Sequence, residues 1–195
     1  AHLEQEELAP RPWLGVGQST GAAILATDAL ARGEDSQWAG LALLAPLVRP
    51  WGWRQASWLH LLAGPFLSSV PRKFRPNSTD EEFAAFLRDR DPLQADRVAV
   101  DWVSAMRRWM PRLLALPPNP VPTLILQGEQ DLTVDWEWNL EVLKEKFPNA
   151  EVHLHPEARH HLVNEAEPIR LALFESLDRF IDALAPGATV EKTTS

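Results

Sequence analysis

Short apolar runs alternate with helical periodicity near the start of the chain. Residues 13–17 form an apolar run that ends in glycine, which predicts a buried strand. Residues 21–31 are rich in alanine and place their apolar positions at helical spacing, and Gly33 follows as a stop signal. A second apolar run, residues 41–45, is closed by Pro46. Near-continuous apolar strands separated by a helix predict a parallel sheet that is covered on both faces.

The same rhythm returns after residue 120. Residues 123–128 predict a strand that ends in a turn, and residues 137–147 predict a helix. Residues 150–155 alternate as a strand, and residues 168–184 form a strongly amphipathic helix. We therefore assign residues 1–48 and 120–195 to one α/β core.

The middle of the chain, residues 49–119, differs in character. It is rich in tryptophan and proline, has helical stretches at 80–88 and 96–110, and contains no strand-like run, so it predicts a helical cap or lid inserted into the core. Ser78 or Thr79 is the expected N-cap of the first helix. Trp51, Trp53 and Trp58 lie close together in sequence, which suits a partly wet substrate pocket under a lid, or a plain cap packed by its tryptophans.

Composition narrows the classes of function. A chain of 195 residues with 45% hydrophobic and 24% charged residues predicts a globular domain. The net charge of -8 and the lack of a long basic stripe argue against a nucleic-acid partner. The absence of cysteine excludes disulfides, thiolate nucleophiles and cysteine-ligated zinc. No apolar run is long enough for a bilayer span, and the start has neither an initiator Met nor a signal-peptide pattern, so we expect a cytoplasmic protein of which this chain is a piece.

One motif suggests a nucleophile. The sequence Gly17-Gln18-Ser19-Thr20-Gly21 has the form G-x-S-x-G and lies between a predicted strand and a predicted helix. Such a turn needs flanking residues without bulk, and it lifts the serine hydroxyl clear of the sheet. The backbone N–H of Thr20 would then face a developing oxyanion. The alternative is a tight turn with an incidental serine.

A serine nucleophile needs an acid and a base, which in this arrangement follow in the order acid, then histidine. Asp131 follows the strand at 123–127, at the carboxyl edge of the predicted sheet where sites of open α/β sheets lie. Asp135 is the nearest competitor, with a solvent-facing helix cap as its expected role. Glu129 is a weaker candidate because it lies within the turn.

The base must come from a later loop, and His160 and His161 follow the last predicted strand. Spacing alone does not choose between them. Metal binding by these two residues with His153 and His155 is the competing interpretation, but no established ligand spacing is present, so we expect no metal. His60 is interpreted as a pocket or surface residue.

Residues 17–21 (GQSTG), 128–131 (GEQD) and 158–165 (ARHHLVNE) together resemble the α/β-hydrolase superfamily, and more narrowly its lysophospholipase and monoacylglycerol lipase branch. The resemblance implies a three-layer α/β fold with a helical cap. It also prefers His160 over His161, because the branch carries a His-x-Leu-x-x-Glu segment that maps onto His160, Leu162 and Glu165. Residues 91–93 and the helix with Trp102 resemble the lid region.

Two departures from that family affect the site. Gln18 and Thr20 flank the serine where the branch has other residues. The family also has earlier strands and a glycine-rich loop that gives the second oxyanion N–H, so we expect this chain to be the C-terminal part of the fold. The rest would be supplied by another segment or chain.

The expected function is hydrolysis of carboxylic esters, with lipid-like esters as the expected substrates. The reaction would use Ser19, His160 and Asp131 and an acyl-enzyme, without a cofactor. A tryptophan-rich cap would favour lipid substrates and could contact a membrane surface. A thioesterase, peptidase or acyltransferase on the same fold is the first alternative. A non-catalytic interaction module that kept the fold is the second.

Overall fold

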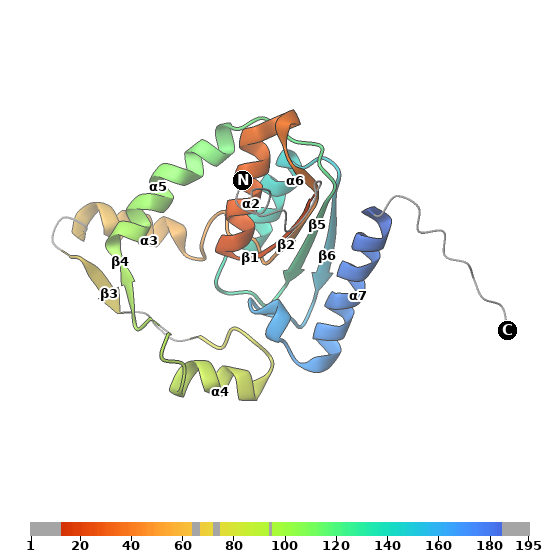
Figure 1. Cartoon of the computed structure of the whole chain (residues 1–195). Coiled ribbons are helices and arrows are strands. Elements are labelled where there is room, and N and C mark those ends of the chain that lie inside the picture. Colours follow the sequence, from red (N-terminus) through yellow and green to blue (C-terminus); the bar gives the residue numbers. More distant parts are fainter. Residues whose placement is uncertain (1–12, 64–66, 72–74, 94, 185–195) are drawn as a thin grey trace, which may run out of the picture.

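A computed structural model of the chain describes residues 13–63, 67–71, 75–93 and 95–184 (Figure 1). The elements are, in order, β1 (Trp13–Gln18), α2 (Thr20–Arg32), η1 (Gly33–Asp35), β2 (Trp38–Leu44), α3 (Trp53–Ala63), β3 (Ser69–Pro71), α4 (Glu81–Asp89), β4 (Arg97–Ala99), α5 (Val100–Ala115), β5 (Thr123–Gly128), α6 (Trp136–Lys146), β6 (Ala150–His155), η3 (Leu162–Asn164) and α7 (Glu167–Leu184). No helix within these ranges is both long and apolar enough to cross a bilayer.

The main sheet has four strands in the order β1-β2-β5-β6, and every neighbouring pair in it is parallel. Alternate residues of β2 point to opposite faces. Leu41 and Leu43 pack with α2 and α6, whereas Ala42 and Leu44 pack with α7. Figure 1 shows α7 on one side of the sheet and α2 and α6 on the other. The predicted three-layer α/β fold with buried parallel strands is therefore confirmed.

The predicted elements of residues 13–45 and 123–184 are present with ends shifted by a few residues. The middle of the chain is helical as predicted, but the expectation that it contains no strand is wrong. β3 and β4 pair as an antiparallel two-stranded sheet. Each strand has three residues, which is too short to produce an alternating hydrophobic pattern.

The start of α4 also differs from the prediction. Its N-cap is Asp80, whose carboxylate accepts a hydrogen bond from the backbone N–H of Phe83 at 2.9 Å. The hydroxyls of the two expected caps, Ser78 and Thr79, instead donate to residues 164 and 165. Asp80 therefore caps α4, because the side chains of Ser78 and Thr79 are engaged in tertiary contacts.

A buried amide anchors the point where the chain leaves β2. Asn139 on α6 is fully buried, and its Oδ1 accepts from the backbone N–H of Arg49 at 2.9 Å. Its Nδ2 donates to the carbonyl oxygens of Pro46 and Arg49, each at 3.1 Å. These bonds hold the beginning of the segment between β2 and β5 against the core.

Candidate active site

Ser19 lies in a strained turn between β1 and α2. Its φ of 53° and ψ of -113° fall outside the helical and extended regions, an uncommon conformation for a residue with a side chain. The turn is fixed by backbone bonds of Ser19: its N–H donates to the Leu44 carbonyl at 2.9 Å, and its carbonyl accepts from Ala23 N–H at 3.1 Å and from Leu47 N–H at 3.2 Å. Strain of this kind gathers at functional sites, where surrounding structure holds it in place.

The two glycines of the motif have different roles. A Cβ on Gly17 would lie 2.7 Å from the carbonyl carbon of Gly21 and 2.8 Å from the amide nitrogen of Ala22, so β1 can approach α2 this closely only with glycine at 17. A Cβ on Gly21 would meet no atom of the described residues within 4 Å. The contacts therefore require a small residue at position 17, as expected, whereas no contact requires one at position 21.

Asp131 follows β5 and is 1% exposed. Its Oδ1 accepts from the backbone N–H groups of Thr133 at 2.7 Å and Val134 at 3.2 Å. Its Oδ2 lies 2.7 Å from Nδ1 of His160 and accepts from Nε2 of Gln127 at 3.2 Å. Both oxygens are thus fixed by hydrogen bonds, which leaves the carboxylate in one orientation.

His160 lies between Asp131 and Ser19. Its Nδ1 faces the Asp131 carboxylate, and its Nε2 lies 3.0 Å from Oγ of Ser19. The loop that carries His160 passes directly over the end of β5, because a Cβ on Gly128 would lie 2.6 Å from the carbonyl carbon of Ala158 and closer still to the carbonyl oxygens of Ala158 and Arg159. The structure therefore joins the three residues that sequence reasoning selected, in a continuous series of hydrogen bonds.

The competing acids and the second histidine occupy other places. His161 packs edge-on against Phe83, with ring centroids 5.6 Å apart, and its ring does not stand between Ser19 and Asp131. Asp135 is at the N-cap position of α6, but its side chain makes no cap bond and instead pairs with Arg49 at 2.6 Å. Its expected role as a solvent-facing cap is therefore wrong, because the arginine after β2 engages the carboxylate.

The other three histidines of the described residues lie away from this series. His153 on β6 contacts the carboxylate of Glu151 at 2.6 Å. Burial, together with the nearby His153, lowers the pKa of His155. Nε2 of His60 on α3 lies 2.7 Å from Oγ of Ser104 on α5. Within the described residues, no three His, Cys, Asp or Glu side chains gather as a metal site.

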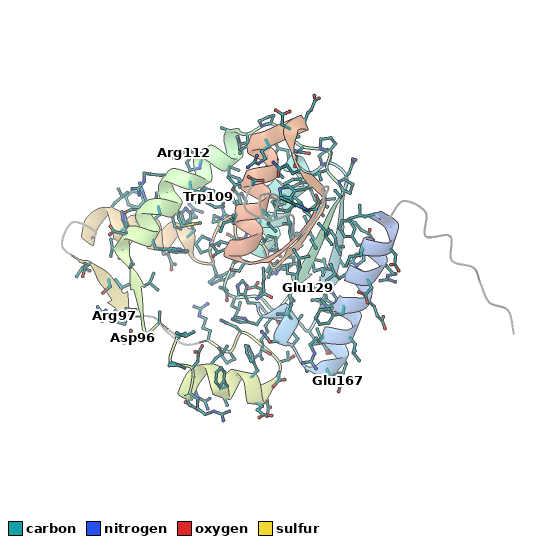
Figure 2. All side chains as sticks on the ribbon, viewed as in Figure 1. Asp96, Arg97, Trp109, Arg112, Glu129 and Glu167 are labelled. Carbon is teal, nitrogen blue, oxygen red and sulfur yellow. The ribbon has the colours of Figure 1, made fainter. Side chains whose placement is uncertain are left out.

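An apolar groove of about 520 Å³ begins at Thr20, the residue after Ser19. It runs along α2 to Ala31, and its opposite wall is formed by Trp102, Met106 and Trp109 of α5. Trp109 is held there by a hydrogen bond from its indole N–H to Oγ1 of Thr27 at 3.1 Å, and Figure 2 shows it on the side of α5 toward α2. Sequence reasoning missed this wall, although residues 102, 106 and 109 have the spacing of one helical face.

The tryptophans that were expected to line the pocket are arranged differently. Trp51 is 51% exposed and Trp58 is 69% exposed, and neither lines the groove beside Ser19. Trp53 packs against the buried cluster that contains Leu47 and Met106, and it does not line the groove either. Trp53 and Trp58 line a separate small hollow at α3. Trp51 precedes α3, whereas Trp53 and Trp58 belong to it, so the three tryptophans do not form one wall of the groove.

Comparisons with known proteins agree with this architecture. A model of the family described as serine aminopeptidase, S33, matches residues 1–167. A solved structure of a soluble variant of monoglyceride lipase from Saccharomyces cerevisiae superposes with a TM-score of 0.75 and 18% identity, over 95% of this chain and 66% of that one.

Two further structures are similar. The monoacylglycerol lipase of Paleococcus ferrophilus has a TM-score of 0.72 and 19% identity, over 92% of this chain and 71% of that one. A thermostable carboxyl esterase from Bacillus coagulans, in complex with glycerol, has a TM-score of 0.68 and 17% identity, over 94% of this chain and 68% of that one. No curated protein sequence matches the chain. The chain thus spans about two thirds of the length of the solved structures that it matches.

Proposed function

The chain belongs to the serine aminopeptidase S33 family of α/β hydrolases, and on that premise we propose that it is the catalytic part of a serine hydrolase of carboxylic esters. The observation that carries the proposal is the continuous bonding from Oγ of Ser19 through the His160 ring to the buried carboxylate of Asp131. An unaided serine hydroxyl is a poor nucleophile, and an adjacent oriented histidine is the usual means of activating it.

In the proposed reaction, Nε2 of His160 accepts the Ser19 hydroxyl proton as Oγ attacks the ester carbonyl carbon. Asp131 stabilises the imidazolium and fixes the ring by accepting from Nδ1–H. The imidazolium then gives its proton to the departing alkoxide, which leaves an acyl group on Ser19. Water, deprotonated by His160, attacks that acyl group; the bond from the acyl carbon to Oγ breaks, the imidazolium returns its proton to Ser19, and the carboxylic acid is released.

The backbone N–H of Thr20 is the proposed first oxyanion donor. It belongs to the first turn of α2, whose amides lack acceptors within the helix and lie at the positive end of the helix dipole. Two such N–H groups serve this reaction in the α/β-hydrolase fold. The proposal places the second donor in a part of the protein outside the described residues.

We propose a lipid-like ester as substrate. The groove that begins at Thr20 is lined mainly by apolar side chains, which suits an acyl chain better than a polar substituent. Two of the similar structures are, by their descriptions, monoglyceride or monoacylglycerol lipases. Trp58, Leu59 and Leu61 of α3 are each more than half exposed, and the proposal gives this face a peripheral contact with a lipid surface.

A peptidase is the second candidate, because the matching family is described as a serine aminopeptidase. An aminopeptidase needs a carboxylate to receive the substrate ammonium group. Asp28 is the acidic residue among those that line the groove, but Arg32 and the Trp38 indole already bond to it, at 2.8 and 2.9 Å. Because the Asp28 carboxylate already has these two partners, we favour an ester over a peptide as the substrate.

The test is labelling of the full-length protein by a fluorophosphonate probe. We expect labelling that is lost in Ser19→Ala and retained in Ser104→Ala, a control in which a serine beside another histidine is changed. The p-nitrophenyl esters of increasing chain length should then be hydrolysed best beyond acetate, and aminoacyl anilides poorly. No labelling of the wild-type protein would refute the hydrolase proposal, and an optimum at acetate would refute the lipid-like substrate.

A further inference from the structure

Glu165 is a buried carboxylate that the proposed reaction does not use. It is fully buried, and no ion pair within the described part of the chain joins it to a basic side chain. Its Oε1 accepts from the backbone N–H of Arg159 at 2.6 Å. Its Oε2 accepts from the backbone N–H of Thr79 at 2.5 Å and also from the Thr79 hydroxyl. Burying an ionised group is costly unless such bonds compensate it, so its presence needs an explanation.

The carboxylate joins two stretches that are far apart in sequence. One is the histidine loop, residues 158–166, and the other is segment 77–80, which leads into α4. Further bonds run alongside it: the N–H of His161 donates to the Asn77 carbonyl at 2.8 Å, and the Ser78 hydroxyl donates to the Asn164 carbonyl at 2.5 Å. In Figure 1, α4 accordingly lies close to the start of α7.

Glu165 acts on the histidine loop immediately before His160. The Asp131 carboxylate fixes the His160 ring, but the backbone that carries this ring is held at the preceding residue, by the bond from Arg159 N–H to Glu165. We propose that Glu165 is a positioning residue that holds the histidine loop against segment 77–80 and thereby keeps Nε2 of His160 within reach of Ser19. This inference rests on the proposed function for its catalytic consequence only.

A carboxylate is required for this role because the groups around it are donors. Two backbone N–H groups and one hydroxyl point at its two oxygens. A glutamine has one acceptor oxygen and an NH2 group that would face an N–H donor. Either the Arg159 or the Thr79 amide would therefore lose its acceptor, and the loop would have to move to find another.

The experiment compares Glu165→Gln with Glu157→Gln, an exposed glutamate on the turn before the same loop. A displacement of about 1 Å at a catalytic group costs on the order of a hundredfold in rate, so kcat per folded molecule of Glu165→Gln should fall between about tenfold and a hundredfold, with KM changed less than about threefold. Glu157→Gln should match the wild type. The folded fraction is measured by urea unfolding, since loss of stability alone lowers the amount of enzyme but not its rate per folded molecule.

A second readout does not depend on activity. The proton between Nδ1 of His160 and Asp131 should give a downfield resonance in the wild type that is lost or broadened in Glu165→Gln and retained in Glu157→Gln. If Glu165→Gln does not fold, Thr79→Val is read in the same way; it removes the hydroxyl that donates to Glu165 and that also accepts from the backbone N–H of Ala166 at 3.2 Å. An unchanged resonance and an unchanged rate per folded molecule overturn the inference. Absence of wild-type labelling at Ser19 overturns the proposed function instead, while the resonance still tests Glu165.

Discussion

Replacing Gly128 by alanine should move His160, the proposed catalytic base, without a direct contact to its ring. The new Cβ would lie 2.6 Å from the carbonyl carbon of Ala158 and closer still to two carbonyl oxygens, whereas an ordinary contact begins at 3.4 Å, so the histidine loop must retreat by at least about 0.8 Å. The neighbouring atoms are backbone rather than flexible side-chain ends, so the loop itself must shift. His160 follows Ala158 by two residues and would carry this displacement to its bonds with Asp131 and Ser19.

A shift of this size predicts a loss of roughly a hundredfold in kcat/KM, because misplacement of a catalytic group by about 1 Å costs about that much. The assay is the second-order rate of fluorophosphonate labelling together with p-nitrophenyl ester hydrolysis, each corrected for folded fraction. Gly21→Ala is the matched control, because it adds the same atom beside Ser19 where no described atom lies within 4 Å. Equal rates in Gly128→Ala and the wild type, or equal losses in both variants, would refute the reasoning.

Two further predictions concern stability. Asn139→Ala removes three hydrogen bonds to the backbone of residues 46 and 49, so the free energy of unfolding should fall by about 2–4 kcal/mol, as measured by urea unfolding, and a loss below about 1 kcal/mol would contradict it. Burial lowers the pKa of His155 in the folded protein below that of an unfolded histidine, which is about 6.5. As the pH falls through that value, the unfolded state therefore binds more protons than the folded state, and the protein loses stability. His155→Gln should reduce the fall in the urea midpoint between about pH 7.5 and 5.5; an identical fall in both proteins would show that His155 is not its source.

The amino-acid sequence by itself determined the layers and the neighbourhood of the site. Strands that are buried on both faces read as continuous apolar runs, and the runs at β2 and β5 therefore identified a parallel sheet. The carboxyl ends of parallel strands meet at one edge of a sheet, so the sequence alone predicts that Ser19 and Asp131 lie at the same edge. Both inferences depend on local patterns, and local patterns are what a sequence records directly.

The tertiary structure decided what depends on contacts between distant segments. The path of the histidine loop over Gly128 places the ring of His160, rather than His161, between Ser19 and Asp131. The same loop accepts hydrogen bonds from the hydroxyls of Ser78 and Thr79, which were expected to cap α4. The N-cap of α4 is therefore Asp80. The groove wall came from α5 rather than from the tryptophan cluster near residue 51, because burial of a side chain depends on which helix faces which. Adjacent residues share a local sequence but not an environment, so only the packed chain distinguishes them.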